Sequence, residues 1–345
     1  MFALQPMVGK MLLPLVGGAP AGWIVAMAFF QMMLLAGYIG AHLLSKVSPR
    51  IHILGFISLL CLGLFFLPIY LREGALTNSS SPGAVDIFWV LLGQVAAPFI
   101  ALSATSSTLQ RVFMHSKNTS ASDPYFLYAA SNLGSFGGLL LYPFAIEPWL
   151  TLTAQSHMWR IAYIVLLALV ILCAVITRHT QLPERRKEDT SLTPLTLHQC
   201  LAWTVLAFIP SSLLLSVTTF ITTDIISVPL IWIVPLSLYL LTFVAAFSQR
   251  NNAVSMPLLE IMLLGGIGLA IILMIVRSGA ITISIQSIHF HLFLFTLVAF
   301  YCHCKLADLR PLNQPQHLTA FYLFLAVGGA LGGAINAFII PNIYD

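Results

Sequence analysis

The chain has 345 residues, of which 59% are hydrophobic and only 8% are charged. Soluble domains carry about 25% charged residues, so this composition excludes a globular surface that faces water and favours one that faces lipid. The formal net charge of +4 comes from basic residues scattered along the chain and does not indicate nucleic-acid binding,.

Apolar stretches separated by short polar segments run along the whole chain. A membrane-spanning helix needs about 20 mostly apolar residues. The first stretch, residues 1–17, is short. We expect an all-α, polytopic transmembrane helix bundle of about 11 spans, with the lipid bilayer as its main partner. The ten full-length stretches are residues 20–44, 51–71, 86–110, 126–148, 158–178, 197–220, 227–248, 255–276, 281–303 and 317–340.

The short first stretch leaves two explanations open. Met1 already lies within apolar sequence, without a cytoplasmic lead. In the first explanation, which we favour, the chain is a fragment or its start is assigned too late. In the second, contacts within an oligomer allow a short first helix.

The longest charged segment, residues 179–196, divides the stretches into two groups. Six lie in residues 1–178 and five in residues 197–345. This is the layout of a two-bundle transporter of the major facilitator type with one helix missing at the end, and many such folds are built from repeated halves. The halves share no strong sequence identity, so the expectation of two bundles joined by a charged cytoplasmic loop rests on layout.

Polar residues are concentrated in the first, fourth, seventh and tenth stretches, whereas the third and sixth are almost wholly apolar. Polar groups within a span tend to face the protein interior or a water-filled cavity. In a major-facilitator-type fold, helices 1, 4, 7 and 10 line the central cavity. We therefore expect these four at the centre, and the third and sixth against lipid. The polar residues are Gln5, Lys10, Gln94, Ser103, Thr105, Ser106, Ser107, Thr108, Ser211, Ser212, Ser216, Thr218, Thr219, Asp224, Gln286, His289 and His291.

The distribution of Lys and Arg predicts the orientation, because these residues stay on the cytoplasmic side. With the N-terminus inside, eleven fall in inner loops and three in outer loops, and 11 spans put the C-terminus outside. No cleavable signal peptide is visible, and we expect a multi-pass protein of the cytoplasmic (inner) membrane. The inner set is Lys46, Arg50, Arg111, Lys117, Arg178, Arg185, Arg186, Lys187, Arg250, Lys305 and Arg310, and the outer set is Arg72, Arg160 and Arg277.

Lys10 is the most informative single residue, because it lies within the first stretch, about 10 Å from its outer end at 1.5 Å per residue. Snorkelling of the side chain is one explanation. A lone ammonium at this depth costs at least ~2.5–3.5 kcal/mol, so we favour a partner carboxylate or a solute contact. Glu147 and Asp224 both lie near the outer face. We prefer Asp224, because the first and seventh spans take equivalent places in the two halves.

Cysteine and histidine spacings favour no metal site. Cys302, His303 and Cys304 are consecutive, and neighbouring helical residues point in different directions, so they cannot easily share one metal,. His289 and His291 also face different directions, and a structural role is favoured over a proton relay or a solute contact. The glycine runs at 134–138, 265–268 and 328–333 allow close helix packing.

Several long segments carry a resemblance to a known family. They are QPMVGKMLLPLVGGAPAGW at 5–23, FQMMLLAGYIGAHL at 30–43, DPYFLYAASNLGS at 123–135, YPFAIEPWLTLTAQSHMW at 142–159, TTDIISVPLIWIVPLSLYLLTF at 222–243 and HLTAFYLFLAVGGALGGAINAFIIP at 317–341. They resemble the membrane half of the spermidine-synthase-like membrane proteins, in which a major-facilitator-like domain is fused to a spermidine synthase.

The chain departs from that family in three places. The residues that usually complete the first helix before QPM are absent. A segment usually similar to CHGEL reads Cys302, His303, Cys304, Lys305, Leu306, so a base replaces an acid. The chain also stops at Asp345, on the predicted outer side, without the synthase-like domain. The resemblance therefore does not imply that this chain is an enzyme, and no cofactor is expected.

Three functions stay open. The first is a carrier for a small solute, with a cationic amine as the solute that the resemblance suggests and Lys10, Gln94, Glu147, Asp224 and His289 in the pathway. The second is a non-transporting membrane module that anchors or feeds a separate synthase-like partner protein. The third is a truncated remnant.

Overall fold

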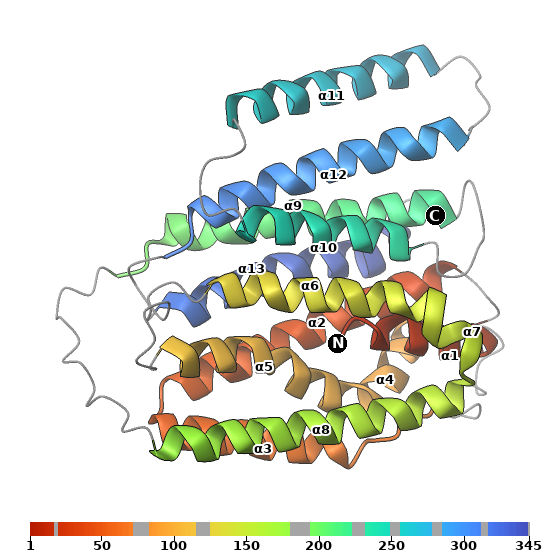
Figure 1. Ribbon diagram of the computed structural model, residues 1–345. Helices are drawn as coiled ribbons and strands as arrows, with labels where there is room; N and C mark the ends of the chain where they lie inside the picture. Colours follow the sequence, from red (N-terminus) through yellow and green to blue (C-terminus); the bar gives the residue numbers. More distant parts are fainter. Residues whose placement is uncertain are drawn as a thin grey trace.

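The computed structural model describes residues 1–16, 20–71, 83–114, 125–179, 194–222, 232–248, 256–277, 285–311 and 317–343. Every regular element in these ranges is helical, as Figure 1 shows. The elements are α1 (Leu4–Val16), α2 (Pro20–Ser45), α3 (Pro49–Leu64), α4 (Ala84–Gln94), α5 (Ala96–Met114), α6 (Tyr125–Leu141), η3 (Tyr142–Ile146), α7 (Glu147–Trp149), α8 (Leu152–His179), α9 (Leu197–Phe220), α10 (Ile233–Ser248), α11 (Met256–Arg277), α12 (Ile285–Asp308), α13 (Leu318–Ala334), η6 (Ile335–Ile339) and η7 (Ile340–Asn342).

Each of the 11 predicted stretches contains one of these helices or a pair of them, so the chain is an all-α, polytopic transmembrane helix bundle. In the described part of the chain, five helices are long and apolar enough to cross a bilayer, and α4 with α5 makes a sixth across a bend of 71°. The five are Gly22–Ser45, Leu152–Ile176, Leu197–Phe220, Ile288–Asp308 and Leu318–Asn342. Shorter apolar helices account for several of the other stretches.

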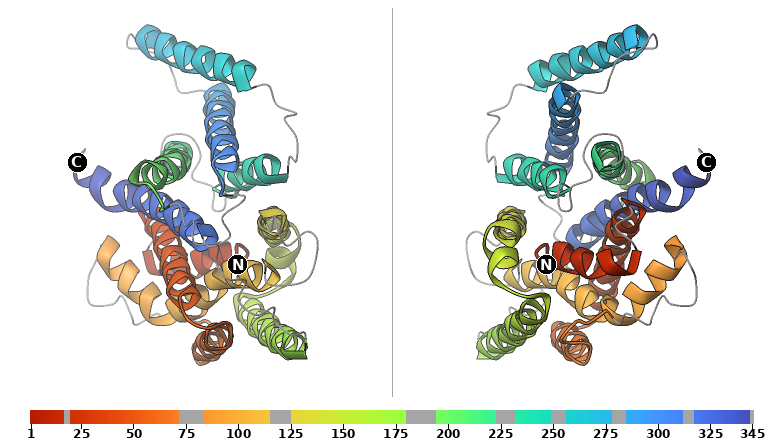
Figure 2. Two further views of the ribbon diagram at one scale, coloured as in Figure 1. Left: turned by 90° about the vertical axis from the view of Figure 1, so that its left-hand side faces the viewer. Right: turned by 90° about the vertical axis from the view of Figure 1, so that its right-hand side faces the viewer.

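The two groups of helices, α1–α8 and α9–α13, meet along two seams (Figure 2). At one seam α2 packs against α13, and at the other α6 packs against α10. This is the two-bundle layout that the sequence predicts. The α2–α13 seam is hydrogen-bonded near its end, where His42 Nδ1 lies 2.9 Å from Thr319 Oγ1. The α6–α10 seam is aromatic, because the Tyr128 ring packs against Phe243 and Phe247 with ring centroids 5.8 and 5.5 Å apart.

The fourth predicted stretch, 86–110, is broken rather than continuous. The chain bends by 71° between α4 and α5, around Val95. Pro98 lies in the first turn of α5. Proline has no backbone N–H and disfavours a helical conformation in the residue before it, so Pro98 accounts for a break in the helix at this position.

The fifth predicted stretch ends in a proline-shaped corner. Pro143 lies in the π-helical turn η3, and Pro148 follows in α7. Leu150 is extended, which turns the chain into α8. This corner places Glu147 at the end of α6, beside α1.

The third and sixth predicted stretches face lipid, as expected. Only 11% of the α8 span is buried, and Ile161, Leu172 and Ile176 are more than half exposed. On α3, Ile51 and Leu54 are 56% and 52% exposed. A helix with a broad apolar exposed surface is stable in hydrocarbon, where no polar group needs water.

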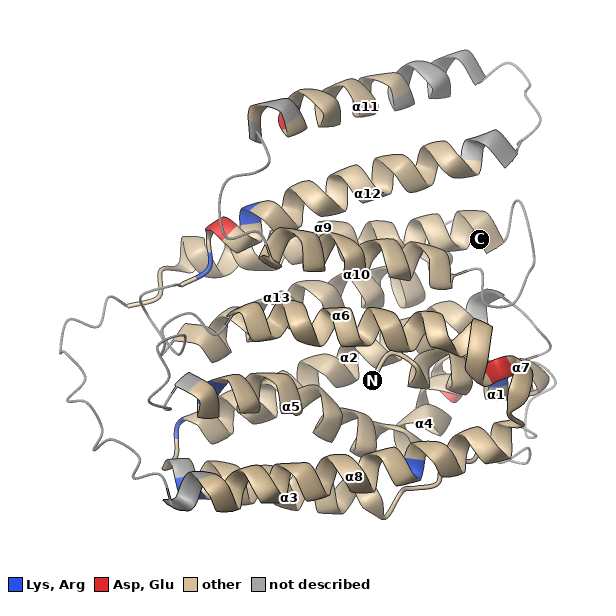
Figure 3. Cartoon of the chain, in the orientation of Figure 1, with Lys and Arg blue, Asp and Glu red and all other residues tan. Residues whose placement is uncertain are grey.

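The charged residues lie at the two ends of the bundle (Figure 3). One end of the bundle carries basic residues from several helices. The ends of α2, α3 and α5 that meet there carry Lys46, Arg50 and Arg111. The end of α12 carries Lys305, and Arg310 follows it. We call this the basic end. Figure 3 shows a second group of charged positions toward the opposite end, beside α1 and α7, the helices that carry Lys10 and Glu147. Which side of the membrane each end faces stays a prediction.

Candidate functional site

A cavity of about 480 Å³ lies between the two groups of helices. Its walls come from α1, α2, α5, α6 and α8 on one side and from α9, α10 and α13 on the other. Helices from both halves therefore surround one space, which is the position expected for a binding site in a two-bundle membrane protein.

The described cavity wall is polar and aromatic but carries no Lys, Arg, His, Asp or Glu side chain. Apolar residues such as Phe30, Leu102 and Leu240 complete it. Amide and hydroxyl groups can both donate and accept hydrogen bonds, and tyrosine rings offer flat apolar faces. The polar lining residues are Gln5, Gln31, Tyr38, Ser103, Thr105, Ser106, Gln110, Tyr128, Ser131, Asn132, Ser135, Ser211, Tyr239 and Tyr322.

Toward the basic end, the wall is built around Gln110 and Tyr322. The Tyr322 hydroxyl donates to Gln110 Oε1 at 2.8 Å, and Gln110 Nε2 donates to Ser106 Oγ at 3.0 Å. Gln110 and Ser106 face one another because they are one helical turn apart. Tyr322 and Gln110 are both 1% exposed, so this bond between α13 and α5 is almost fully removed from solvent.

Three tyrosine rings gather around this bond. Tyr38 of α2 stacks on Tyr322 with ring centroids 6.0 Å apart, and Tyr128 of α6 lies 4.7 Å from the same ring. Asn132, one turn after Tyr128, donates from Nδ2 to the Tyr128 carbonyl oxygen at 2.9 Å. Both halves therefore meet at a tyrosine cluster on the basic-end side of the cavity.

At mid-depth, a hydrogen-bond chain joins α2, α9 and α13. Gln31 Nε2 donates to Ser211 Oγ at 2.9 Å, and Ser211 Oγ donates to the Gly329 carbonyl oxygen at 3.1 Å. Gln31 Oε1 is buried without a hydrogen-bond partner among the described groups. This chain fixes the α2–α13 seam beside the cavity.

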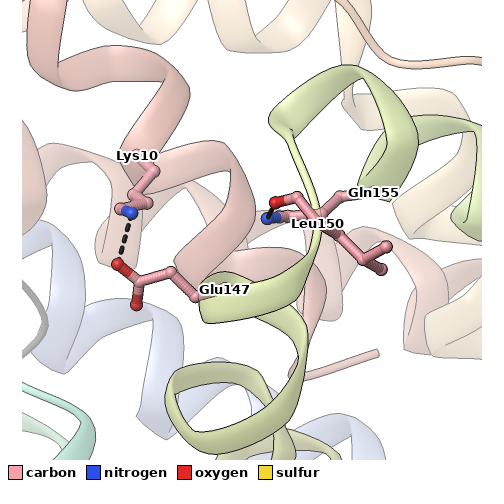
Figure 4. A network of polar contacts seen from close by, with 4 residues as sticks. All are labelled: Lys10, Glu147, Leu150 and Gln155. Carbon is pink, nitrogen blue, oxygen red and sulfur yellow. Dashed lines mark hydrogen bonds and ion pairs between the residues drawn. The ribbon is translucent and has the colours of Figure 1, made fainter.

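At the N-terminal side of the bundle, Met1, Phe2 and Gln5 line the cavity, and two indole rings pack beside α1. Trp23 of α2 and Trp232 lie 5.6 Å apart between ring centroids. Gly9 of α1 packs directly on the Trp23 ring, where a Cβ atom would collide with it. Beside this contact, Lys10 Nζ forms an ion pair with Glu147 Oε1, which Figure 4 shows next to the α7–α8 corner. The Gln155 Nε2 to Leu150 oxygen bond of 2.8 Å holds that corner.

The prediction that Lys10 has a carboxylate partner is confirmed, because its ammonium lies beside a carboxylate. The partner is Glu147, the second of the two candidates, and the pair is about one-quarter exposed at 29% and 24%. Asp224, which we preferred, lies in residues 223–231, outside the described part of the chain. The pair lies outside the cavity wall and ties α1 to the end of α6.

The other predicted pathway residues do not line the cavity. Gln94 ends α4 at the bend, with its Oε1 buried and without a partner among the described groups. His289 is exposed on α12, and no described α12 side chain lines the cavity. The expectation that the tenth span is central is therefore wrong for this cavity. α12 packs instead between α9, α10 and α11.

Sequence reasoning missed the second, fifth, eighth and eleventh spans as cavity walls. A signal was present in the fifth, because Tyr128, Ser131, Asn132 and Ser135 follow the i, i+3, i+4, i+7 spacing of one helix face,. It was overlooked because single tyrosine and asparagine residues in apolar helices carry less weight than a serine run. The run at 103–108 was recognised, and Ser103, Thr105 and Ser106 do line the cavity.

Comparisons with known proteins give little. No protein-family model matches the chain, and no curated protein matches it. Among solved structures, the chain is similar to the fucose:proton symporter FucP of E. coli, with 13% identity, a TM-score of 0.48, and coverage of 99% of this chain and 90% of that one. A likeness of this size does not carry an assignment of family or activity. The spermidine-synthase-like resemblance finds no support in these comparisons.

Proposed function

We propose that the chain is a membrane carrier for a small, uncharged, ring-containing solute. The observation that carries this proposal is the cavity of about 480 Å³ whose walls come from both helix groups. A space enclosed by two bundles can be exposed to either side of the membrane by rocking one bundle against the other. Its volume falls in the range of about 300–1,000 Å³ that small-molecule sites occupy.

The wall chemistry favours the class of solute. Gln5, Gln31 and Asn132 bring amides, and Ser131 and Ser211 bring hydroxyls. Such groups match the hydroxyl, amide or imide groups of a neutral solute without a charge to neutralise. The tyrosine rings provide stacking surfaces for a flat ring.

The cationic amine suggested by the sequence fits this wall less well. A polyamine brings several ammonium groups, and burying them without carboxylates is costly. The described wall has no carboxylate. Glu147, which the sequence placed in the solute pathway, lies outside this wall and is paired with Lys10. The tyrosine faces are the one feature that favours a cation, through cation–π contact.

A non-transporting module for a synthase-like partner is the alternative that the sequence leaves open. An anchor has no need of a space lined by polar groups from seven helices, because burying such groups in a bilayer is costly,. The lined cavity therefore favours a carrier over an anchor. We also propose that this multi-pass protein lies in the inner membrane with its basic end in the cytoplasm, because Lys and Arg are retained on that side.

Counterflow in proteoliposomes tests the proposal directly. The purified chain is reconstituted, and exchange of labelled uridine, glucose, phenylalanine and spermidine is measured. We expect a neutral ring compound to exchange and spermidine not to. Tyr322→Phe removes the hydroxyl that holds Gln110 and should lower exchange about 10-fold, the usual cost of one hydrogen bond in a buried polar site.

The matched control is Tyr70→Phe. Tyr70 is 44% exposed, and its hydroxyl lies 2.9 Å from His157 Nε2, away from the cavity. This variant should exchange like the parent chain. Exchange of spermidine alone, or equal effects of the two tyrosine variants, would contradict an uncharged solute bound in this cavity.

A further inference from the structure

His303 is buried directly behind the cavity wall formed by α10. Its side chain is 0% exposed, and it is held between aromatic rings. The imidazole stacks on Phe243 with centroids 3.6 Å apart and meets the edge of Tyr239 at 5.0 Å. Both of these rings also line the cavity, so a solute against them is separated from His303 by one layer of side chains.

The hydrogen bonds around His303 fix which nitrogen carries the proton. Thr242 Oγ1 donates to the Tyr239 carbonyl oxygen at 2.8 Å. A hydroxyl has one proton, so when that proton is directed to the carbonyl, the same oxygen accepts from His303 Nδ1, which lies 2.9 Å away,. In this arrangement the neutral imidazole carries its proton on Nδ1, and Nε2 bears an unshared electron pair.

Nε2 is buried and has no hydrogen-bond partner among the described groups. A buried polar atom without a partner is uncommon and requires an explanation. In this ring the lone pair is a basic site placed within a membrane-spanning bundle. Such ionisable groups in spans commonly belong to ion or proton paths.

The titratable groups around His303 are few in the described helices that pack with it. They are Tyr239 on α10, Tyr301, Cys302, Cys304, Lys305 and Asp308 on α12 itself, Glu260 on α11, and His198 and Cys200 in the first turn of α9. Glu260 is engaged by Lys305 at 3.3 Å and accepts from the Tyr301 hydroxyl at 3.3 Å. Asp308 is more than one helical turn from His303 on α12,. None of these groups lies in the cavity wall except Tyr239.

We propose that His303 binds the proton that is transported together with the solute, an inference that rests on the proposed carrier function. One proton is transferred from hydronium to the Nε2 electron pair: an N–H bond forms, an O–H bond of hydronium breaks, water is left, and nothing is oxidised or reduced. The face of Phe243 favours the cation. No acceptor for the new N–H lies within hydrogen-bond distance of Nε2 among the described groups, so protonation requires Tyr239 and Phe243 to rearrange. Because the same rings touch the solute, proton and solute binding are coupled.

His303→Asn separates the two roles of the ring. The Asn amide can still donate to Thr242 Oγ1 from about the Nδ1 position, but no titratable nitrogen remains. We expect counterflow of the exchanging neutral solute to stay within about twofold of the parent chain, because exchange needs no net proton movement. Accumulation driven by a pH gradient should be lost. His157→Asn, at an exposed histidine outside the cavity, should keep both activities.

Accumulation that persists in His303→Asn would overturn the proposal. A second measurement, independent of any solute, covers a variant that fails to fold. Nitrogen NMR of the histidine-labelled parent chain should show one Nδ1-protonated ring at about pH 8 that becomes an imidazolium when the pH is lowered. Thr242→Val identifies this signal by shifting it.

A ring protonated on Nε2 at about pH 8, or one that stays neutral down to the lowest pH at which the chain stays folded, would also overturn the proposal. If no solute of the panel exchanges in the parent chain, the carrier function fails. The NMR result still decides whether His303 is a proton-binding site.

Discussion

The glycine-rich helices α13 and α6 carry similar runs, GGALGG at 328–333 and GSFGG at 134–138, but use them differently. In α13, a Cβ on Gly328 would collide with the Thr204 carbonyl oxygen, and one on Gly332 would lie 2.8 Å from Ser212 N. In α6, nothing lies within 4 Å of a Cβ built on Gly134 or Gly137. The same motif therefore brings two helices together in one half and leaves open space, including part of the cavity wall, in the other.

The neighbouring helices explain the difference. α13 packs closely on α9 and α2. Asn336 adds a buried hydrogen-bond network, with Nδ2 donating to Ser212 Oγ at 2.8 Å and Oδ1 accepting from Ser216 Oγ at 2.9 Å. In the α6 run, Gly138 has a neighbour at ordinary contact distance, since the Cβ of Ala3, just before α1, lies 3.8 Å from a Cβ built on Gly138. Small residues permit a close approach but do not supply the partner.

The largest expected effect comes from filling the α13 glycine face. Gly328→Ala should destabilise the folded chain by about 1–3 kcal/mol, because the α9 backbone cannot yield to the added methyl group. Gly134→Ala should be neutral or slightly stabilising, since alanine favours a helix by about 1 kcal/mol and the space is open. Thermal unfolding in detergent measures both. Equal losses in the two variants would mean that the two faces do not differ.

The next effect concerns the ion pair that ties α1 to the end of α6. Lys10→Met or Glu147→Gln alone should lower stability by about 1–3 kcal/mol, between the values for exposed and buried pairs. The double variant should recover part of that loss. A double-mutant cycle in detergent measures the coupling. If the stability losses of the Lys10 and Glu147 variants add in this cycle, and a second cycle shows coupling between Lys10 and Asp224, then Asp224 is the partner of Lys10.

A smaller effect is expected at the lipid surface. Leu172→Ala on α8, at a side chain that is 54% exposed, should change stability by no more than about 0.5 kcal/mol,. Leu214→Ala on α9, at a cavity-lining side chain that is 2% exposed, should cost about 2–5 kcal/mol,. Unfolding of the two leucine variants side by side checks this. A larger loss at Leu172 would place α8 inside the bundle.

Orientation is tested without a change in stability. Reporter fusions at residues 187 and 345 should report opposite sides of the membrane, with residue 187 in the cytoplasm, because Lys and Arg are retained there. Fusions that report the same side would exclude an odd number of crossings after the charged segment.

The sequence predicted the helices and the lipid-facing spans well, because both follow from local apolar content. The broken fourth span was missed although Pro98 was visible, since a proline can kink a span or end it. The partner of Lys10 was narrowed to two carboxylates, but the choice between them depends on how helices pack. The cavity wall was predicted least well, because Tyr38, Tyr128 and Tyr322 come from three separate helices and meet only in the fold.

The central claim is that the space between α6 and α13 binds the solute. In a variant whose five cysteines are replaced by alanine, Ser131→Cys places a thiol on the cavity wall and Tyr70→Cys places one outside it. The rate of reaction with N-ethylmaleimide is measured with and without the neutral solute that exchanges in counterflow. The account predicts that this solute slows labelling at position 131 several-fold and leaves position 70 unchanged, because a bound ligand excludes the reagent from its site. Equal labelling at position 131 with and without the solute would contradict it.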